Sequence, residues 1–379
     1  MPSPPQPSSH AAAQVDLDAI RSNIALLADR ASGAAVMGVV KADGYGHGML
    51  PAARAMLAGG ATWLGVAFVE EALQLRAAGI QVPTVAWILP PGADLATAIT
   101  ADIDLGVSDA RVLDAVADAA GSVGRSARVH LKVDTGLTRG GVPADQWPAV
   151  VESAARAEAT GRIHVVGVFS HFACADEPGH SSIDAQISAF HTALGVVEKA
   201  GLEPRVRHLA NSAATLTRPE THFDLVRPGI ASYGICPIPE LTDTGLRPAM
   251  TLSSDLALVK PAPAGSGVSY GHRYITDRDT RVALVPLGYG DGVPRNATNR
   301  AEVAIAGDRF PIAGTVCMDQ FMVDVGDAPV PEDGRVHLFG PGDAGEPTAQ
   351  DWAGATGTIP YEIVTRISPR VPRVYIGDQ

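Results

Sequence analysis

With 379 residues, 46% of them hydrophobic and 18% charged, the chain can bury a large core and is expected to form two domains. Its net charge of −12 provides no positive surface for nucleic acid or an anionic membrane, so the composition favours a small-molecule partner. The sequence contains no run of about 18 or more apolar residues, which argues against a membrane-spanning helix.

The first ten residues, MPSPPQPSSH, lack the basic and then apolar order of a secretory signal. We therefore expect a cytoplasmic protein in which residues 1–12 form a disordered tail. The three cysteines, Cys174, Cys236 and Cys317, have neither the paired spacing of a zinc site nor the even number of a disulfide scaffold. Reduced thiols and no metal site are predicted.

Between residues 13 and 244, short runs rich in Val and Ile alternate with helical patterns, as in β-α units around a parallel sheet. Eight strands over roughly 225 residues match a (β/α)8 barrel. A doubly wound open sheet is the alternative that the pattern leaves open. The predicted strands are Ala35–Val40, Trp63–Phe68, Thr84–Leu89, Asp104–Val107, Ala127–Val133, Ile163–Phe169, Val206–Ala210 and Phe223–Val226.

Helical periodicity is clear between these strands. Ser182–Ala200 carries apolar residues at steps of three or four, and Gly201 is expected to end that helix in a left-handed conformation. Ser108 is the expected N-cap of another helix, which is predicted to stop before Gly121.

Residues 245–379 follow a different pattern and predict a smaller, mainly β domain. Alternating segments such as Arg281–Leu287 and Ala301–Ile305 are separated by turns rich in Gly, Pro and Asp.

Unusual polar residues follow or end five of the eight predicted barrel strands, where a parallel barrel builds its active site. Any one of them alone is weak evidence, but together they favour a cofactor pocket. They are Lys41, Lys132, Asp134, Arg139, His171, His208, Asn211, Ser212 and Arg227.

These residues differ in the chemistry that they offer. Lys41 breaks an apolar strand before a glycine-rich turn, and a buried amine can condense with an aldehyde. Ser212 and the backbone of Gly229–Ile230 would form an anion site after the seventh and eighth strands. Arg139 and Arg227 offer guanidinium forks for a carboxylate and a ring nitrogen. Together these groups suit pyridoxal phosphate.

The chain resembles the alanine racemase family over nearly its whole length, from about Val15 to Tyr375. The motifs that carry the resemblance are VKADGYGH (40–47), HLKVDTGLTR (130–139), FSHFA (169–173), ANSA (210–213), VRPGI (226–230), VSYG (268–271), LGYGDG (287–292) and CMD (317–319).

The resemblance implies a pyridoxal-phosphate enzyme that interconverts L-alanine and D-alanine and supplies D-alanine for peptidoglycan. Lys41 would hold the cofactor as an internal aldimine and act as one acid/base. Tyr270 would be the other, reaching in from the second subunit of a homodimer. Inversion at an α-carbon needs one group to remove a proton from one face and another to return it on the opposite face.

The same resemblance assigns the remaining roles. Arg227 would face the pyridine nitrogen with support from His208, and Lys132 resembles a lysine that many relatives carry as a carbamate. Cys317 and Asp319 are weaker candidates, for which packing or turn roles suffice. The other cofactor-binding residues would be Tyr45, His171, Asn211, Ser212, Gly229, Ile230 and Tyr361, and the substrate-binding residues Arg139, Tyr289 and Met318.

Three alternatives remain from the residues. A basic-amino-acid decarboxylase would need an acidic partner for the pyridine nitrogen, against which Arg227 argues. A broad-specificity racemase is harder to exclude, because rejecting one methylene is worth only about 1–3 kcal/mol. A non-catalytic pyridoxal-phosphate carrier would need no second domain, so residues 245–379 favour catalysis.

Overall fold

The computed structural model describes residues 10–31 and 33–377. Clustering of contacts divides this part of the chain into two compact units, which we call the barrel unit and the β unit. The barrel unit comprises Ile20–Gly44 and Ala52–Leu246. The β unit comprises Tyr45–Pro51, the chain from Arg247 onwards and the described residues up to Ala19.

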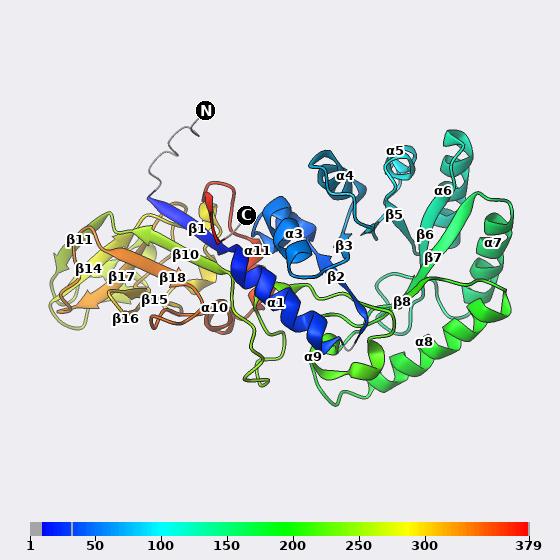
Figure 1. The fold of residues 1–379 in the computed structure, drawn as a ribbon. Coiled ribbons are helices and arrows are strands. Elements are labelled where there is room, and N and C mark those ends of the chain that lie inside the picture. The colour runs from blue at the N-terminus through cyan, green and yellow to red at the C-terminus, as the bar shows by residue number, and fades with distance from the viewer. Residues whose placement is uncertain (1–9, 32, 378–379) are drawn as a thin grey trace. The chain divides into compact units, whose positions relative to one another are not determined.

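Eight parallel strands form the barrel and confirm the predicted architecture (Figure 1). In the order β8-β7-β6-β5-β4-β3-β2-β9, each strand pairs with its neighbour. Backbone bonds from Asp224 N to Arg207 O (3.1 Å) and from Arg227 N to Ala210 O (2.9 Å) nearly close the seam. This closure excludes the open sheet. The strands are β2 (Ala35–Val39), β3 (Trp63–Val66), β4 (Thr84–Ala86), β5 (Asp104–Val107), β6 (Ala127–Lys132), β7 (Ile163–Phe169), β8 (Val206–His208) and β9 (Leu225–Val226).

Helices follow the strands, as the periodicity predicts. Gly201 has a φ of 75°, in agreement with the predicted left-handed stop of α8. The predicted ends of α6 are wrong: Asp109 accepts from Val112 N and caps the helix, which runs past Gly121 to a left-handed Gly124. The helices are α1 (Leu17–Arg30), α3 (Met49–Ala58), α4 (Val69–Ala77), α5 (Leu95–Thr100), α6 (Ala110–Val123), α7 (Trp147–Ala159), α8 (Ser182–Lys199) and α9 (Ser212–Thr217).

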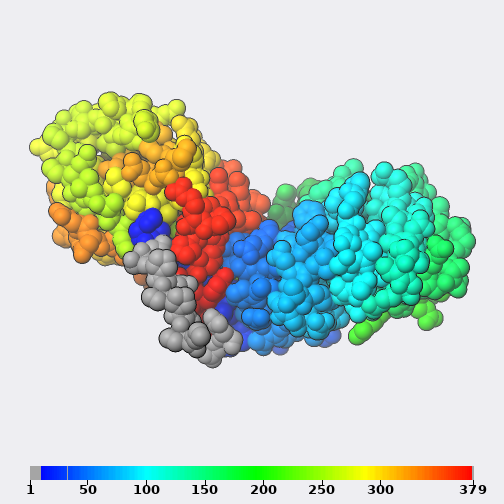
Figure 2. Space-filling model, turned by 90° about the horizontal axis from the view of Figure 1, so that it is seen from above, coloured from blue at the N-terminus to red at the C-terminus, as the bar shows by residue number. Residues whose placement is uncertain are grey.

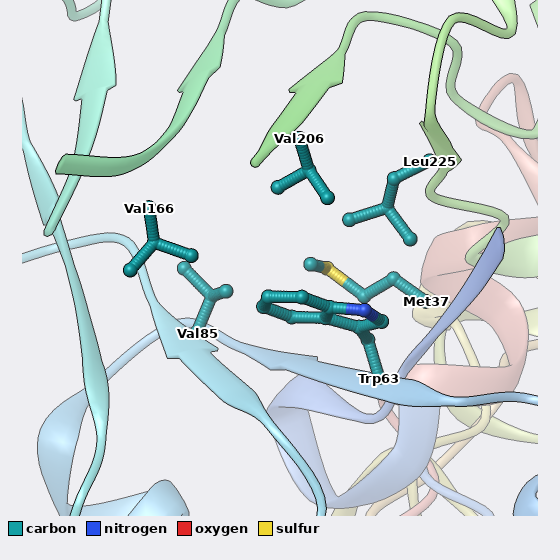
Figure 3. Packing of buried hydrophobic residues seen from close by; sticks show 6 residues of the cluster. All are labelled: Met37, Trp63, Val85, Val166, Val206 and Leu225. Carbon is teal, nitrogen blue, oxygen red and sulfur yellow. The ribbon is translucent and has the colours of Figure 1, made fainter. Parts of the chain in front are cut away.

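Apolar side chains from six strands meet inside the barrel (Figure 3). They are Met37, Trp63, Val85, Val166, Val206 and Leu225. The two strands that contribute none of these six, β5 and β6, carry buried polar residues, Asp104 and His130. The His130 ring stands edge-on to Trp63 at 5.6 Å, so a polar group borders the apolar layer.

The β unit contains three antiparallel or mixed sheets, as expected of a mainly β domain. The six-stranded sheet has the order β16-β15-β18-β10-β1-β19, beside sheets β11-β14-β17 and β12-β13. Two helices, α10 (Ala349–Thr356) and α11 (Pro360–Thr365), belong to the same unit. The strands are β1 (Ala11–Asp16), β10 (Met250–Asp255), β11 (Leu258–Ala262), β12 (Gly267–Val268), β13 (Tyr274–Ile275), β14 (Thr280–Val285), β15 (Glu302–Ile305), β16 (Asp308–Pro311), β17 (Phe321–Gly326), β18 (Arg335–Phe339) and β19 (Arg373–Ile376).

The predicted disordered tail is wrong at Ala11 and Ala12, which lie in strand β1; residues 1–9 lie outside the described part. β1 pairs antiparallel with β10 and parallel with β19, so blue N-terminal residues lie beside red C-terminal ones (Figure 2). Buried Ala11, Ala13 and Val15 alternate along the strand and provide the reason for the order. The N-terminal strand thus belongs to the β unit, whereas the proposed boundaries of 13–244 and 245–379 place it with the barrel.

Among the helices of the described chain, none combines the length and apolar character needed to cross a membrane.

Candidate active site

Lys41 lies two residues after the last residue of β2 and begins a strained turn, α2 (Lys41–Tyr45). Three successive residues from Ala42 onwards are left-handed, with φ values of 52°, 52° and 62°. Because left-handed backbone is costly for residues other than glycine, such a turn needs an anchor. The Glu71 carboxylate supplies it by accepting from Ala42 N at 2.7 Å and from Ala67 N at 2.8 Å.

The Lys41 amine lies in surroundings that favour its neutral form. Burial lowers its pKa, and the charge of Arg139 lowers it further, while Glu71 acts in the opposite direction. A lysine that loses its proton more easily is a better nucleophile toward an aldehyde and a better proton carrier. The predicted reactive amine therefore has a physical basis in the barrel.

Further cations share this end of the barrel with Lys41. Burial lowers the pKa of Lys132 to about 8, with contributions from Arg139 and Arg227. Burial and the charges of Arg227, Arg139, Lys132 and Lys41 hold the pKa of His171 well below its usual value. His171 is therefore neutral at physiological pH. A concentration of positive charge of this kind suits a ligand that carries phosphate and carboxylate groups.

Arg227 is held in one orientation by acceptors around its guanidinium. It is 6% exposed, and its Nη2 donates to Ser170 O at 2.7 Å. Its Nη1 lies 3.1 Å from His208 Nδ1, and its Nη2 lies 3.3 Å from His171 Nδ1. Burial lowers the pKa of Arg227 to about 9, which leaves it protonated at neutral pH.

The predicted anion site forms a cradle of hydroxyl and amide groups after β8 and β9. Ser212 Oγ accepts from Gly229 N at 2.8 Å and from Ala231 N at 3.2 Å. Because these two bonds use its lone pairs, the hydroxyl proton is available to an anion. Asn211 accepts from Ala214 N at 3.1 Å and so caps α9, which positions Ser212 at the first turn of that helix.

Tyr45 and Tyr361, the two tyrosines assigned to the phosphate, lie together in the β unit. Their ring centroids are 6.2 Å apart. Burial and the neighbouring Tyr361 raise the pKa of Tyr45 far above its usual value, so it is a neutral phenol that can donate a hydrogen bond.

The β unit also brings together the expected second acid/base, Tyr270, and two of the expected substrate-binding residues, Tyr289 and Met318. Tyr270, Tyr289 and Met318 are 76%, 40% and 53% exposed, and they line one pocket of about 300 Å³ with Cys317. Thr315 Oγ1 donates to Tyr270 O at 2.7 Å and helps to hold the tyrosine turn. An exposed phenol and thioether on one surface are available to another chain.

Cys317 and Asp319 have structural partners in the β unit. Cys317 Sγ lies 3.4 Å from Ser269 Oγ, and Asp319 accepts from Arg370 at 2.9 Å. Packing and turn roles account for these contacts, as the sequence left open.

Sequence reasoning missed Glu71, Asp104 and His130. Glu71 stands three residues after Phe68 at the start of α4, a spacing that signals a capping carboxylate. Asp104 and His130 were included in predicted strands, yet a charged or polar residue within a buried parallel strand is unusual and could have marked them.

The fold and the site define a class: a (β/α)8 barrel that carries a half-buried lysine of lowered pKa and a cradle of hydroxyl and amide groups, joined to a mainly β domain. The chain belongs to the alanine racemase family. The family model described as "Alanine racemase, N-terminal domain" matches residues 15–237, and "Alanine racemase, C-terminal domain" matches residues 249–375.

Relatives match along the whole chain. An alanine racemase from Thermobifida fusca is 67% identical over 98% of this chain and 99% of its own length. One from Frankia casuarinae is 59% identical over 96% of each chain. Among solved structures, alanine racemase from D-cycloserine-producing Streptomyces lavendulae has a TM-score of 0.97 at 53% identity, covering 99% of both chains. Alanine racemase from Streptomyces coelicolor A3(2) has a TM-score of 0.96 at 53% identity, over 97% of this chain and 98% of the other.

Proposed function

We propose that this chain is a pyridoxal-phosphate-dependent racemase that interconverts L-alanine and D-alanine and supplies D-alanine for peptidoglycan. The observation that carries the proposal is Lys41, a half-buried amine that follows a barrel strand and whose pKa is lowered by burial and by the charge of Arg139. Membership of the alanine racemase family supports the substrate.

The donor set of the barrel unit fits the proposed cofactor. The Ser212 hydroxyl, with the backbone at Gly229 and Ile230, suits a phosphate, and the Arg227 fork suits a pyridine nitrogen that accepts a hydrogen bond. Asn211 supports the cradle, and Tyr45 and Tyr361 are proposed as further phosphate ligands. The chemistry that the cofactor would supply when bound is an electron-withdrawing ring system for the substrate, which would make the α proton more acidic.

The protein residues then bind the substrate and move protons. Arg139 is proposed to orient the substrate carboxylate, with Met318 and Tyr289 at the entrance. Lys41 removes or returns the α proton on one face, and Tyr270 does so on the other. His171, which is neutral, would pack beside the cofactor ring.

A homodimer follows from these roles, because Tyr270, Tyr289 and Met318 would come from the partner subunit. Their joint exposure on the β unit supports this arrangement. We also propose that the enzyme works in the cytoplasm, a reducing compartment that suits the three free cysteines.

Incubation of the holoenzyme with L-alanine tests the function directly. Circular dichroism should decay to the racemic value, and incubation with D-alanine should reach the same end point. If the circular dichroism signal of both enantiomers stays constant while the cofactor is bound, the proposed function is wrong. Parallel assays with L-serine and L-lysine separate an alanine racemase from one of broad specificity.

Replacing Ser212 by Ala should weaken cofactor binding, because the cradle loses its hydroxyl donor and two amides lose their acceptor. The loss of one to two such bonds, about 1–3 kcal/mol, corresponds to a roughly 5–150-fold higher Kd. Spectroscopic titration of the cofactor-free protein measures it. Ser232→Ala is the matched control, since Ser232 Oγ donates to Pro228 O at 3.1 Å in the same segment. Equal Kd values for the two variants would remove Ser212 from the phosphate site.

Lys132 is expected to carry a carbamate. A pKa of about 8 makes roughly a tenth of the amine neutral at pH 7, whereas an ordinary lysine is neutral to well under 0.1%. Only the neutral amine reacts with carbon dioxide, and the anion formed would pair with Arg139. With 13C-bicarbonate, NMR should show a carbamate signal that is absent from Lys132→Ala. An identical spectrum for both proteins, with Lys132 an ammonium at neutral pH, contradicts the modification.

A further inference from the structure

A chain of buried hydrogen-bonding groups crosses the interior of the barrel and ends at Arg227. Arg227 Nη1 lies 3.1 Å from His208 Nδ1, and His208 Nε2 lies 2.8 Å from His130 Nδ1. His130 Nε2 in turn lies 3.2 Å from Asp104 Oδ2. Asp104, His130 and His208 have no exposed surface, so water cannot replace a missing partner.

The chemistry of the two ends determines the position of each proton in this chain. Arg227 can only donate, so His208 Nδ1 must accept and a neutral His208 must carry its proton on Nε2. That proton is donated to His130 Nδ1, which leaves the His130 proton on Nε2, facing Asp104. All three hydrogen bonds therefore point in one direction, from the guanidinium to the carboxylate.

Electrostatics support the protonation states that this assignment needs. Burial and the charge of Arg227 hold the pKa of His208 well below its usual value, so its ring is neutral. Burial alone would raise the pKa of Asp104, but hydrogen bonds from His130 and Arg128 outweigh burial and lower it. Arg128 Nε binds Asp104 Oδ1, and its Nη2 donates to Oδ2 at 3.0 Å. The acceptor end of the chain is thus an ionised carboxylate.

Packing around the two imidazoles keeps the chain continuous across β7. A Cβ at Gly167, the β7 residue paired with His130, would lie 2.3 Å from His130 Nδ1. The missing side chain therefore leaves the space through which His130 reaches β8. Phe169 stacks on the His208 ring, with a centroid distance of 4.8 Å and an interplanar angle of 5°.

We propose that Asp104 and His130 are positioning residues that act on Arg227 by setting the tautomer of His208. Asp104 requires a proton on His130 Nε2, so His130 Nδ1 must accept a hydrogen bond from His208 Nε2. His208 Nδ1 then has no proton and can accept from the Arg227 guanidinium. The guanidinium of Arg227 is thereby held in one orientation. That this orientation serves to bind the cofactor ring nitrogen rests on the proposed function.

Asp104→Asn is an informative variant because it preserves the shape of the side chain but replaces an acceptor facing His130 Nε2 with a donor. With its oxygen toward Arg128 Nε, the Asn side chain puts its amide group in the place of Oδ2, the oxygen that both His130 Nε2 and Arg128 Nη2 face. His130 then carries its proton on Nδ1, and His208 must accept at Nε2. The His208 proton moves to Nδ1, where it meets the Arg227 donor.

The direct readout is 15N NMR of the holoenzyme with labelled histidine, in which protonated and unprotonated ring nitrogens have different shifts. His130→Gln and His208→Gln assign the signals. In the unchanged protein both rings should carry protons on Nε2, and in Asp104→Asn the His130 proton should move to Nδ1. Asp324→Asn is the matched control, a buried carboxylate of the β unit that accepts from Thr280 and Tyr274. Unchanged shifts in Asp104→Asn would overturn the proposal.

A second pair of variants covers the case in which Asp104→Asn does not fold. His130→Gln keeps an acceptor for His208 and a donor for Asp104, whereas His130→Leu keeps neither. The Leu variant should lose about 10–100-fold in kcat/KM, the usual effect of losing a supporting partner, and the Gln variant should recover part of it. Equal losses of kcat/KM in the Gln and Leu variants would show that His130 has only a structural role.

The proposed function and this inference can fail separately. If the unchanged protein does not racemise alanine, the proposed function falls, but the tautomers measured by NMR still decide whether Asp104 controls His208. If it racemises alanine and Asp104→Asn leaves the tautomers as they are, only the inference falls.

Discussion

Tyr270→Phe is expected to lose most racemase turnover while keeping the absorbance of the bound cofactor. The substitution removes one hydroxyl from a side chain that is 76% exposed, so the fold should be little affected. A general acid/base contributes about 10²–10⁴-fold, and turnover in both directions should fall by that factor. Circular dichroism of L-alanine and of D-alanine measures the loss.

Deuterium exchange separates the loss of one base from a general loss of activity. In heavy water, Tyr270→Phe should still exchange the α proton of one enantiomer, because Lys41 serves one face, but it should rarely invert the centre. Tyr274→Phe is the matched control, since it removes a hydroxyl that donates to Asp324 at 2.5 Å in the same unit. Wild-type turnover in Tyr270→Phe would discard the two-base assignment.

Lys41→Ala is expected to have the largest effect of any single substitution. The residue is proposed to anchor the cofactor covalently and to carry a proton, so its removal should cost at least about 10⁴-fold in turnover. Borohydride reduction followed by peptide mass spectrometry should place the cofactor on the Lys41 peptide of the unchanged protein. No cofactor should be trapped in the variant.

Small primary amines test the chemical role further. They should restore part of the turnover of Lys41→Ala if the missing group is an amine that moves a proton. Lys199→Ala, at the exposed end of α8, is the control and should trap cofactor and turn over normally. Trapping at another lysine in the unchanged protein, with full activity of Lys41→Ala, would contradict the assignment.

The barrel strands were predictable because each one carries its own pattern. Val- and Ile-rich runs between helical segments report burial on both faces of a parallel sheet, which is a local property of the sequence. The predicted ends were less accurate for a physical reason. β3 ends at Val66, before Phe68, because the amide of Phe68 donates to Glu71 at 3.2 Å and caps α4 instead.

Strand β1 was missed because its pairing partners are distant in the sequence. Ala11 pairs with Ser254, and Ala13 pairs with Arg373, so nothing near Ala11 indicates the sheet. A strand of small residues after a proline-rich segment has the local appearance of a tail. Its order depends on pairing with distant strands and on the burial of alternate residues that this pairing allows.

The amino-acid sequence by itself determined the class of fold and the chemical groups available, because strand periodicity and the residue types at strand ends are local. The reactive amine, the phosphate seat and the arginine forks could all be named from the order of residues. The tertiary structure decided what those groups can do. Burial and neighbouring charges lower the pKa of Lys41 and bring that of Lys132 to about 8, and these depend on residues far apart in the chain. The same is true of the tautomers between Arg227 and Asp104, since a proton position is set by the partner that folding brings to each nitrogen.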